Sequence, residues 1–195
     1  MIEPIIAYGH NILRKKCKKV VETSEEINDL INNLWQTLER SGGVGLAAPQ
    51  INKGLSVFLV NSTLMYNNLS IEQRKEQFSG DKGIEETFIN AKIIAESKEE
   101  WSDYEGCLSI PGIAEPVNRS WDVIIEYLNK DFQLKRTQYS GYTAKVIQHE
   151  YDHTNGVLFI DHLSALNKKL LNNKLKQIIN GKIDVEYPIQ YLKHS

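Results

Sequence analysis

Apolar side chains recur at intervals of three and four residues over residues 23–42, a spacing that predicts an amphipathic helix. Thr23 and Glu26 form a capping-box pattern at its start, and Gly42 with Gly43 supplies a stop signal at its end. We expect this helix to support the core through one face, made of Ile27, Leu30, Ile31, Leu34 and Leu38.

A β-rich region follows. Residues 55–60 (LSVFLV) have the composition of a short buried strand, and further strands are predicted at 87–97, at 121–129 and around 132–140. Turn signals stand at Pro111-Gly112 and at 129–131. Residues 61–87 are rich in Asn, Ser, Gln, Lys and Glu, which predicts a long polar loop or insertion and not a second domain.

The helical period returns near Ser140 and stops at Asn155-Gly156. A last helix is predicted at about 164–180, with a broad apolar side made of Leu166, Leu170, Leu171, Leu175, Ile178 and Ile179. We therefore expect a single domain spanning residues 1–195, of class α+β, in which a mixed or antiparallel sheet region surrounds the helix that follows Ser140.

Composition describes an ordinary globular chain. Of its 195 residues 41% are hydrophobic and 25% charged, with a formal net charge of -2. This balance lacks the basic excess of a protein that coats nucleic acid, and we expect no DNA partner. The N-terminal residues do not read as a signal peptide and no long apolar run follows, so we expect a cytoplasmic protein with no membrane partner.

The sequence HEYDH at 149–153 places two histidines four residues apart. Because an α-helix turns about 100° per residue, His149 and His153 would lie on one face, one turn apart, and could bind one metal ion. Two hydrogen-bonded or solvated surface histidines remain the alternative for this motif taken alone. A catalytic site with an open position needs three protein ligands, so a third must come from elsewhere.

Cysteine offers that third ligand. With only two cysteines, the chain has no disulfide scaffold and suits a reducing compartment. Cys107 lies between Gly106 and the Pro111-Gly112 pair, where a tight loop could hold a thiolate, although a small buried apolar residue is the usual role of an isolated cysteine. Cys17 lies among Lys and Arg with no histidine nearby, which favours a solvated basic stretch over a reactive thiol.

A glycine-rich stretch, GGVGLAAPQ, occupies residues 42–50. Gly42 and Gly43 are explained by the end of the preceding helix, but Gly45 is not. Gln50 ends the stretch with a neutral amide donor, which can stabilise a developing oxyanion without a defined protonation state.

Three motifs, GVGLAAPQ, EGCLSIPG and QHEYDHTNG, closely resemble in this order the signature motifs of the peptide deformylases. The resemblance extends to the N-terminal segment with Gly9 and Leu13-Arg14 and to the helical C-terminus of classical bacterial members. Thr154 and Ala91 depart from the family pattern, which usually has leucine and proline at these positions. Neither residue is a proposed ligand.

The resemblance implies a hydrolase that removes the formyl group from the N-terminal formylmethionine of nascent polypeptides and releases formate. It implies Cys107, His149 and His153 as metal ligands and Glu150 as the general base. Gln50 and the Leu108 N–H would hold the oxyanion, while Val44 and Gly45 would contact the substrate. The family ion is usually Fe²⁺, although the same ligands suit Zn²⁺ equally well. The methionine pocket should be apolar near Val44 and Val146.

Two other functions compete with this interpretation. H-E-x-x-H is also the signature of zinc endopeptidases, whose third ligand usually lies downstream, where this chain offers Asp161 and His162. A non-enzymatic metal-binding or ribosome-associated module would need neither Glu150 nor Gln50, so the presence of both residues argues against it.

Lysines are concentrated near the C-terminus, where residues 164–182 contain no acid. A solvated helix explains them simply. By resemblance to some bacterial deformylases, the same helix is a candidate for ribosome contact through phosphate attraction. The lysines concerned are Lys168, Lys169, Lys174, Lys176 and Lys182.

Overall fold

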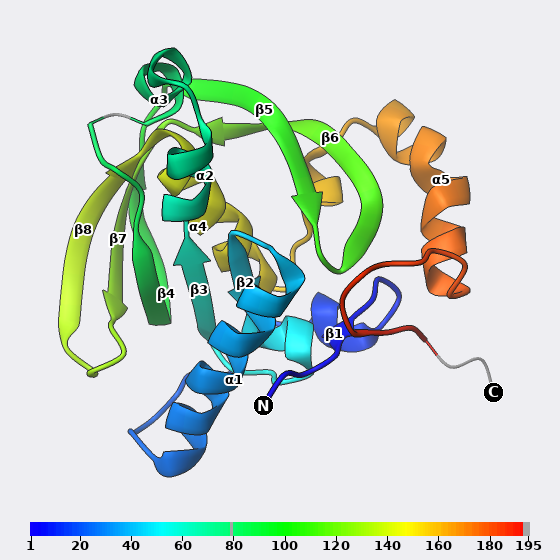
Figure 1. Ribbon diagram of the computed structural model, residues 1–195, viewed down its shortest axis with the longest axis horizontal. Helices are drawn as coiled ribbons and strands as arrows, with labels where there is room; N and C mark the ends of the chain where they lie inside the picture. Colours follow the sequence, from blue (N-terminus) through cyan, green and yellow to red (C-terminus); the bar gives the residue numbers. More distant parts are fainter. Residues whose placement is uncertain (79, 193–195) are drawn as a thin grey trace.

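A five-stranded antiparallel sheet forms one half of the computed structural model, which describes residues 1–78 and 80–192 (Figure 1). Its strand order is β2-β3-β4-β7-β8, so the chain leaves the sheet after β4 and returns at β7. The strands are β2 (Gly45–Ala47), β3 (Val57–Asn61), β4 (Glu85–Glu96), β7 (Asp122–Leu128) and β8 (Leu134–Ser140). The strands predicted at 55–60, 87–97, 121–129 and 132–140 are thereby confirmed.

Two smaller strand pairs complete the β structure. Between β4 and β7 the chain forms a long antiparallel hairpin of β5 (Glu100–Cys107) and β6 (Ile110–Ser120), which the sequence analysis did not predict. The turn expected at Pro111-Gly112 is wrong, because both residues lie within β6. At the other side of the molecule β1 (Ile5–Ile6) pairs in parallel with β9 (Ile189–Gln190).

Helix α1 (Glu25–Ser41) matches the predicted helix at 23–42, but its N-cap lies one residue after the predicted cap. The N-cap is Ser24, whose hydroxyl accepts a hydrogen bond from the Ile27 N–H, so the Thr23 capping box is wrong. The helix ends at Gly42, where a φ of 67° requires the left-handed conformation that glycine tolerates best. Its buried face packs on β2 and β3.

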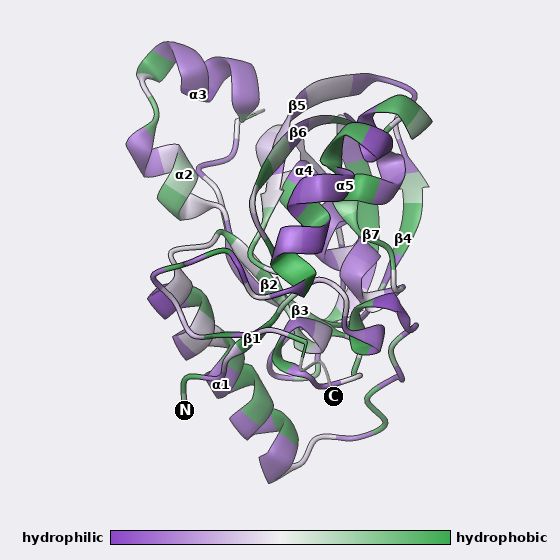
Figure 2. Ribbon diagram, turned by 90° about the vertical axis from the view of Figure 1, so that its right-hand side faces the viewer, coloured by the Kyte–Doolittle hydropathy of each residue, from purple (hydrophilic) through white to green (hydrophobic). Residues whose placement is uncertain are grey.

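The polar segment 61–87 is not the loop that was expected. It contains two short helices, α2 (Thr63–Asn68) and α3 (Ile71–Gln77), before β4 begins at Glu85; residue 79 of this segment lies outside the described residues. A reciprocal capping box between Ser70 and Gln73 starts α3. Figure 2 shows α3 as mostly hydrophilic. Caps and not an apolar face stabilise it, which is why hydrophobic periodicity missed it.

Helix α4 (Gly141–Thr154) is the central element. Eleven of its residues are buried, because it packs against β2, β3 and β8 on the sheet side and against β6 of the hairpin. The predicted α+β class and the central helix are confirmed. Short 3₁₀ turns join the elements around it at η1 (Asn11–Arg14), η2 (Ala48–Ile51) and η3 (Phe159–His162).

Helix α5 (Ala165–Ile179) confirms the predicted last helix and lies against the hairpin side of the fold (Figure 1). Its buried face is narrower than the sequence indicated. Leu171, Leu175 and Ile178 join the core, whereas Leu166 is 66% and Leu170 72% exposed. No helix within the described ranges is both long and apolar enough to cross a membrane.

Candidate active site

Helix α4 and the β5–β6 hairpin bring three metal-ligating side chains together. His149 and His153 lie one turn apart on α4, as their spacing predicted, and Cys107 lies at the end of β5 where the hairpin turns. One ligand atom from each residue lies within 4.8 Å of the others. The Cys107 Sγ is 3.3 Å from His153 Nε2, so the thiol points at the histidine pair and is not an isolated core side chain.

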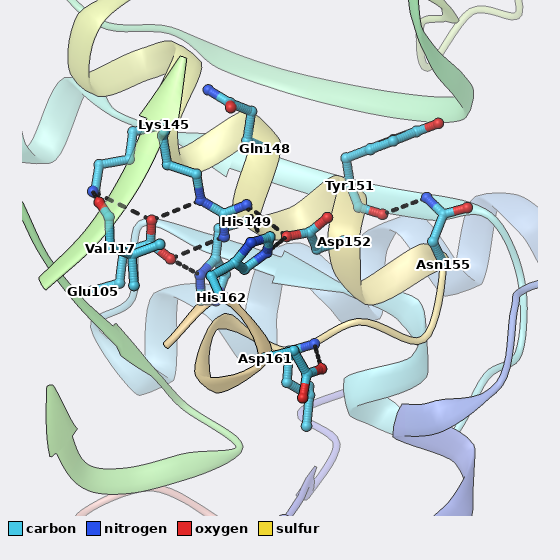
Figure 3. A network of polar contacts seen from close by, with 12 residues as sticks. Glu105, Val117, Lys145, Gln148, His149, Tyr151, Asp152, Asn155, Asp161 and His162 are labelled. Carbon is cyan, nitrogen blue, oxygen red and sulfur yellow. Dashed lines mark hydrogen bonds and ion pairs between the residues drawn. The ribbon is translucent and has the colours of Figure 1, made fainter. Parts of the chain in front are cut away.

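Behind the cluster, Glu105 holds His149 in place. A Glu105 carboxylate oxygen lies 3.0 Å from His149 Nδ1 (Figure 3). The same carboxylate accepts two hydrogen bonds from Arg119, of 2.9 and 3.1 Å. Lys145 Nζ lies 3.3 Å from a Glu105 carboxylate oxygen. Burial opposes ionisation of Glu105, but its hydrogen bonds with His149 and Arg119 outweigh this and lower its pKa well below the ordinary value.

The polar network continues outward from Arg119. One of its nitrogens donates to Asp152 at 2.6 Å, and His162 Nε2 lies 2.7 Å from the same Asp152 oxygen. The sequence analysis assigned no role to Glu105, Arg119 or Asp152. A signal for Glu105 would have needed β5 to be recognised as a strand, because residues two apart in a strand lie on the same face and Glu105 is two residues before Cys107.

The two histidines have opposite electrostatic surroundings. Burial and then the neighbouring His149 lower the pKa of His153 well below the ordinary value, which keeps its ring neutral. Burial also disfavours charge on His149, but hydrogen bonds with Cys107 and Glu105 outweigh it and raise its pKa well above the ordinary value. His149 must therefore give up its ring proton to bind a metal, because neutral imidazole and thiolate are the forms in which these side chains act as ligands.

Glu150 lines the cleft beside the cluster. Its side chain is only 4% exposed, and one carboxylate oxygen has no partner among the described residues. Burial raises its pKa to about 7, a range suited to taking and returning a proton at neutral pH. Gly45 makes room for it, because a Cβ at position 45 would lie 2.5 Å from a Glu150 oxygen.

Gln50 is buried and fixed in orientation by its amide oxygen, which accepts a 2.8 Å hydrogen bond from the Ala47 N–H. Its amide nitrogen is thereby turned towards the hairpin turn, 3.2 Å from Ser109 Oγ and 3.6 Å from Cys107 Sγ. A donor held in this way beside the cluster is placed to contact a ligand oxygen there.

A cleft of about 610 Å³ opens onto this cluster. Val44, Gly45, Leu108 and Val146, which the sequence analysis associated with substrate or oxyanion binding, all line it. Three residues near the C-terminus, at 185–187, line it as well, and nothing in the sequence pattern pointed to them. The volume is sufficient for a short peptide end with one apolar side chain.

Other candidate ligands lie elsewhere. Asp161 pairs with Arg14 and His162 with Asp152, so neither joins the cluster, and the endopeptidase alternative loses its downstream ligand. Cys17 does not line the cleft, and burial raises the pKa of its thiol to about 11, which agrees with the expectation that this thiol is not reactive.

Sequence comparison relates this chain to one protein family. The sequence model of polypeptide deformylase matches residues 2–169. Peptide deformylases of Christiangramia forsetii and Flavobacterium psychrophilum are 42% and 41% identical, covering 98% and 96% of this chain and 96% and 95% of theirs.

Solved structures with a similar fold are also peptide deformylases. The peptide deformylase of Plasmodium falciparum has a TM-score of 0.77 at 30% identity, covering 91% of this chain and 95% of its own. The peptide deformylase of Ehrlichia chaffeensis has a TM-score of 0.79 at 26% identity, covering 91% of this chain and 96% of its own. The chain therefore belongs to the polypeptide deformylases, metal-dependent hydrolases that remove the N-terminal formyl group from nascent polypeptides.

Proposed function

We propose that Cys107, His149 and His153 hold the catalytic metal ion of this deformylase and that Glu150 moves the proton in the reaction. The observation that carries the proposal is the convergence of one sulfur and two imidazole nitrogens within 4.8 Å, beside a buried carboxylate oxygen that has no partner in the described chain. A purely structural metal site needs no such carboxylate.

The side chains fit a divalent ion. Three protein ligands leave a fourth position open for water or substrate, as catalytic sites require. Glu105 engages Nδ1 of His149, the arrangement by which a carboxylate usually orients a metal-binding histidine. An ion bound there would supply Lewis acidity and lower the pKa of a coordinated water towards neutrality.

Each protein group then has a separate task. Glu150 takes a proton from the attacking water and passes it to the leaving amine, so that formate and a free α-amine are released. The Gln50 amide and the Leu108 N–H donate to the oxygen that becomes negative as the formyl carbon turns tetrahedral. Val44, Gly45 and Val146, which line the cleft, hold the methionine end of the peptide.

Formate release from an N-formylmethionyl peptide tests the activity, with the N-acetyl peptide as its matched control. The formyl peptide should be hydrolysed and the acetyl peptide, which carries one more methyl group beside the cluster, should not. Equal release from both, or release from neither, would contradict the proposal.

Fe²⁺ is the ion we propose, with Zn²⁺ as the alternative that the same donors accept. A thiolate with two imidazoles supports either ion, and the family resemblance favours iron. Metal analysis after purification without oxygen, paired with formate release, separates them. Iron should be present in proportion to activity and should be lost together with activity in air.

Ribosome contact through α5 is a second proposal about the same function. Lys169, Lys174 and Lys176 on α5 and Lys182 after it are exposed, whereas Lys168 is half-buried and donates to the Asp161 carbonyl. Phosphate attraction would make this contact weaken steeply with salt. Sedimentation with ribosomes across a salt series should show the intact chain pelleting more than a variant with all five lysines changed to glutamine.

We also propose a cytoplasmic location. The free thiol of Cys107 is part of the cluster, and a reducing compartment keeps such a thiol available as a ligand. Cell fractionation should recover the protein with the ribosomes and other cytoplasmic components.

A further inference from the structure

The segment after α5 returns to the active-site cleft. It follows the helix from Lys182 and is fixed by the pairing of β9 with β1, in which the Ile5 N–H donates to the Pro188 carbonyl at 2.8 Å and the Ala7 N–H to the Gln190 carbonyl at 3.0 Å. In Figure 1 it is the red segment that runs back past β1. The family's sequence model ends at residue 169, well before this segment.

Val185, Glu186 and Tyr187 form the part of the segment that lines the cleft. The Tyr187 ring packs against the core cluster that includes Leu46 and the buried face of α1, where Leu108 also packs. The Tyr187 hydroxyl donates a 2.8 Å hydrogen bond to the Leu108 carbonyl. Burial and the nearby Cys107 raise the pKa of this hydroxyl, so it remains a proton donor at all physiological pH values.

Leu108 lies in the turn of the hairpin, between the paired residues Cys107 and Ile110. Three distant segments hold this turn. The Tyr8 N–H donates to the Ser109 carbonyl at 2.8 Å, Gln50 donates to the Ser109 hydroxyl at 3.2 Å, and Tyr187 donates to the Leu108 carbonyl. Of these three hydrogen bonds, the one from Tyr187 is the one that reaches Leu108.

The two peptide planes that meet at the Leu108 Cα share its backbone rotations. One plane carries the N–H proposed to face the oxyanion, and the other carries the carbonyl that Tyr187 holds. Fixing the carbonyl therefore limits the directions in which the N–H can point. A donor that is already aimed before charge develops stabilises the transition state more than one that must be reoriented.

We infer that Tyr187 is a positioning residue, which acts through Leu108 to aim the Leu108 N–H at the reacting oxygen. The C-terminal segment thus contributes to catalysis and does not merely cover the cleft. This inference rests on the proposed role of Leu108 in the deformylation reaction.

A matched pair of substitutions tests it. Tyr187→Phe and Tyr191→Phe each remove one tyrosine hydroxyl that donates to a backbone carbonyl from the same C-terminal segment. The acceptor for Tyr191 is Ile183, within the segment, and Tyr191 does not line the cleft. Both changes keep the aromatic ring, so a difference between the variants reports on Leu108 and not on the anchoring of the segment.

Kinetics are the first measurement. Tyr187→Phe should lower kcat for an N-formylmethionyl peptide by about 3- to 10-fold, the rate equivalent of one neutral hydrogen bond, with KM within about twofold of the parent value. Tyr191→Phe should leave kcat unchanged. Metal content should be the same in all three proteins.

Hydrogen exchange of the metal-free protein is the second measurement. Amides of residues 107–110 should exchange faster in Tyr187→Phe than in Tyr191→Phe, because only the first change frees the turn. Three results would overturn the inference while leaving the proposed function intact. They are an unchanged kcat in Tyr187→Phe, an equal loss of kcat in both variants, and a raised KM with normal kcat in Tyr187→Phe. A parent protein that releases no formate would overturn both.

Discussion

Replacing Gly45 with alanine should disable Glu150 without touching the metal ligands. A Cβ at position 45 would lie 2.5 Å from a Glu150 carboxylate oxygen and 2.7 and 2.8 Å from its Cγ and Cδ, whereas ordinary contacts begin at 3.4 Å. The three nearest atoms all belong to Glu150, so this side chain must move. We expect a displacement of the carboxylate on the order of 1 Å, and a misplacement of that size lowers turnover by about 10²-fold.

Stability should change much less than activity. Inserting one methyl group into a packed site costs about 1–3 kcal/mol, a loss that leaves a domain of this size folded at assay temperature. Gly45→Ala should therefore retain its metal and show kcat for formate release reduced by about 10²-fold. Gly54→Ala is the matched control, because a Cβ there would meet only Ile12 Cδ1, at an ordinary 3.6 Å.

A double variant identifies the route of the effect. If Gly45→Ala acts by displacing Glu150, adding it to Glu150→Gln should cause little further loss, since interacting positions are not additive. The reasoning is refuted if Gly45→Ala keeps turnover within about threefold of the parent, if it loses its metal, or if Gly54→Ala is equally impaired.

Further substitutions address the remaining assignments. Glu150→Gln should retain metal while kcat drops by about 10²- to 10⁴-fold, and near-normal formate release would remove the acid–base role. Cys107→Ser should weaken or alter metal binding while Cys17→Ser leaves metal and activity intact; equal tolerance of both would contradict the ligand set. Because burial raises the pKa of Cys17 to about 11, this thiol should react with a disulfide reagent at pH 8 on the order of 10²-fold more slowly in the folded Cys107→Ser variant than in the denatured one. Glu105→Gln leaves Arg119 and Lys145 buried without their shared carboxylate, so urea denaturation should show a loss of about 3–5 kcal/mol, and a loss below 1 kcal/mol would contradict the importance of this network.

Hydrophobic periodicity was sufficient for the elements that bury a regular face. Helix α1 and strand β7 each present such a face, whereas β3 is buried on both faces and was predicted from its continuous apolar run; all three were predicted within a few residues. The β5–β6 hairpin was missed because Glu100–Cys107 leaves most of its side chains partly or fully exposed, so it shows no apolar alternation. The long antiparallel pairing with β6, and not burial of its own face, holds it.

Some residues of the site could be predicted from the sequence and others could not, because only contacts within one regular element leave a local pattern. Spacing on one helix indicates that His149 and His153 converge. The sequence alone made Cys107 a candidate third ligand, and the resemblance of EGCLSIPG to a family motif was needed to choose that role over a small buried apolar residue. Glu105 and Arg119 approach each other across the hairpin that the sequence did not reveal. Tyr187 lies 79 residues from Leu108 in the chain, and no local pattern reports a contact of that range.

The pairing of Ile5 with Ile189 joins two strands that are synthesised far apart in time. Chains emerge from the ribosome N-terminus first, so β1 is among the first described elements to appear and its partner β9 is the last. For almost the whole of synthesis the hydrogen-bonding edge of β1 lacks that partner, and an open edge invites pairing with other chains. The wall of the cleft at 185–187 is likewise absent until these residues have been made. An enzyme that acts on growing polypeptides thus completes its own cleft only late in its own synthesis, after residues 1–184 have been made.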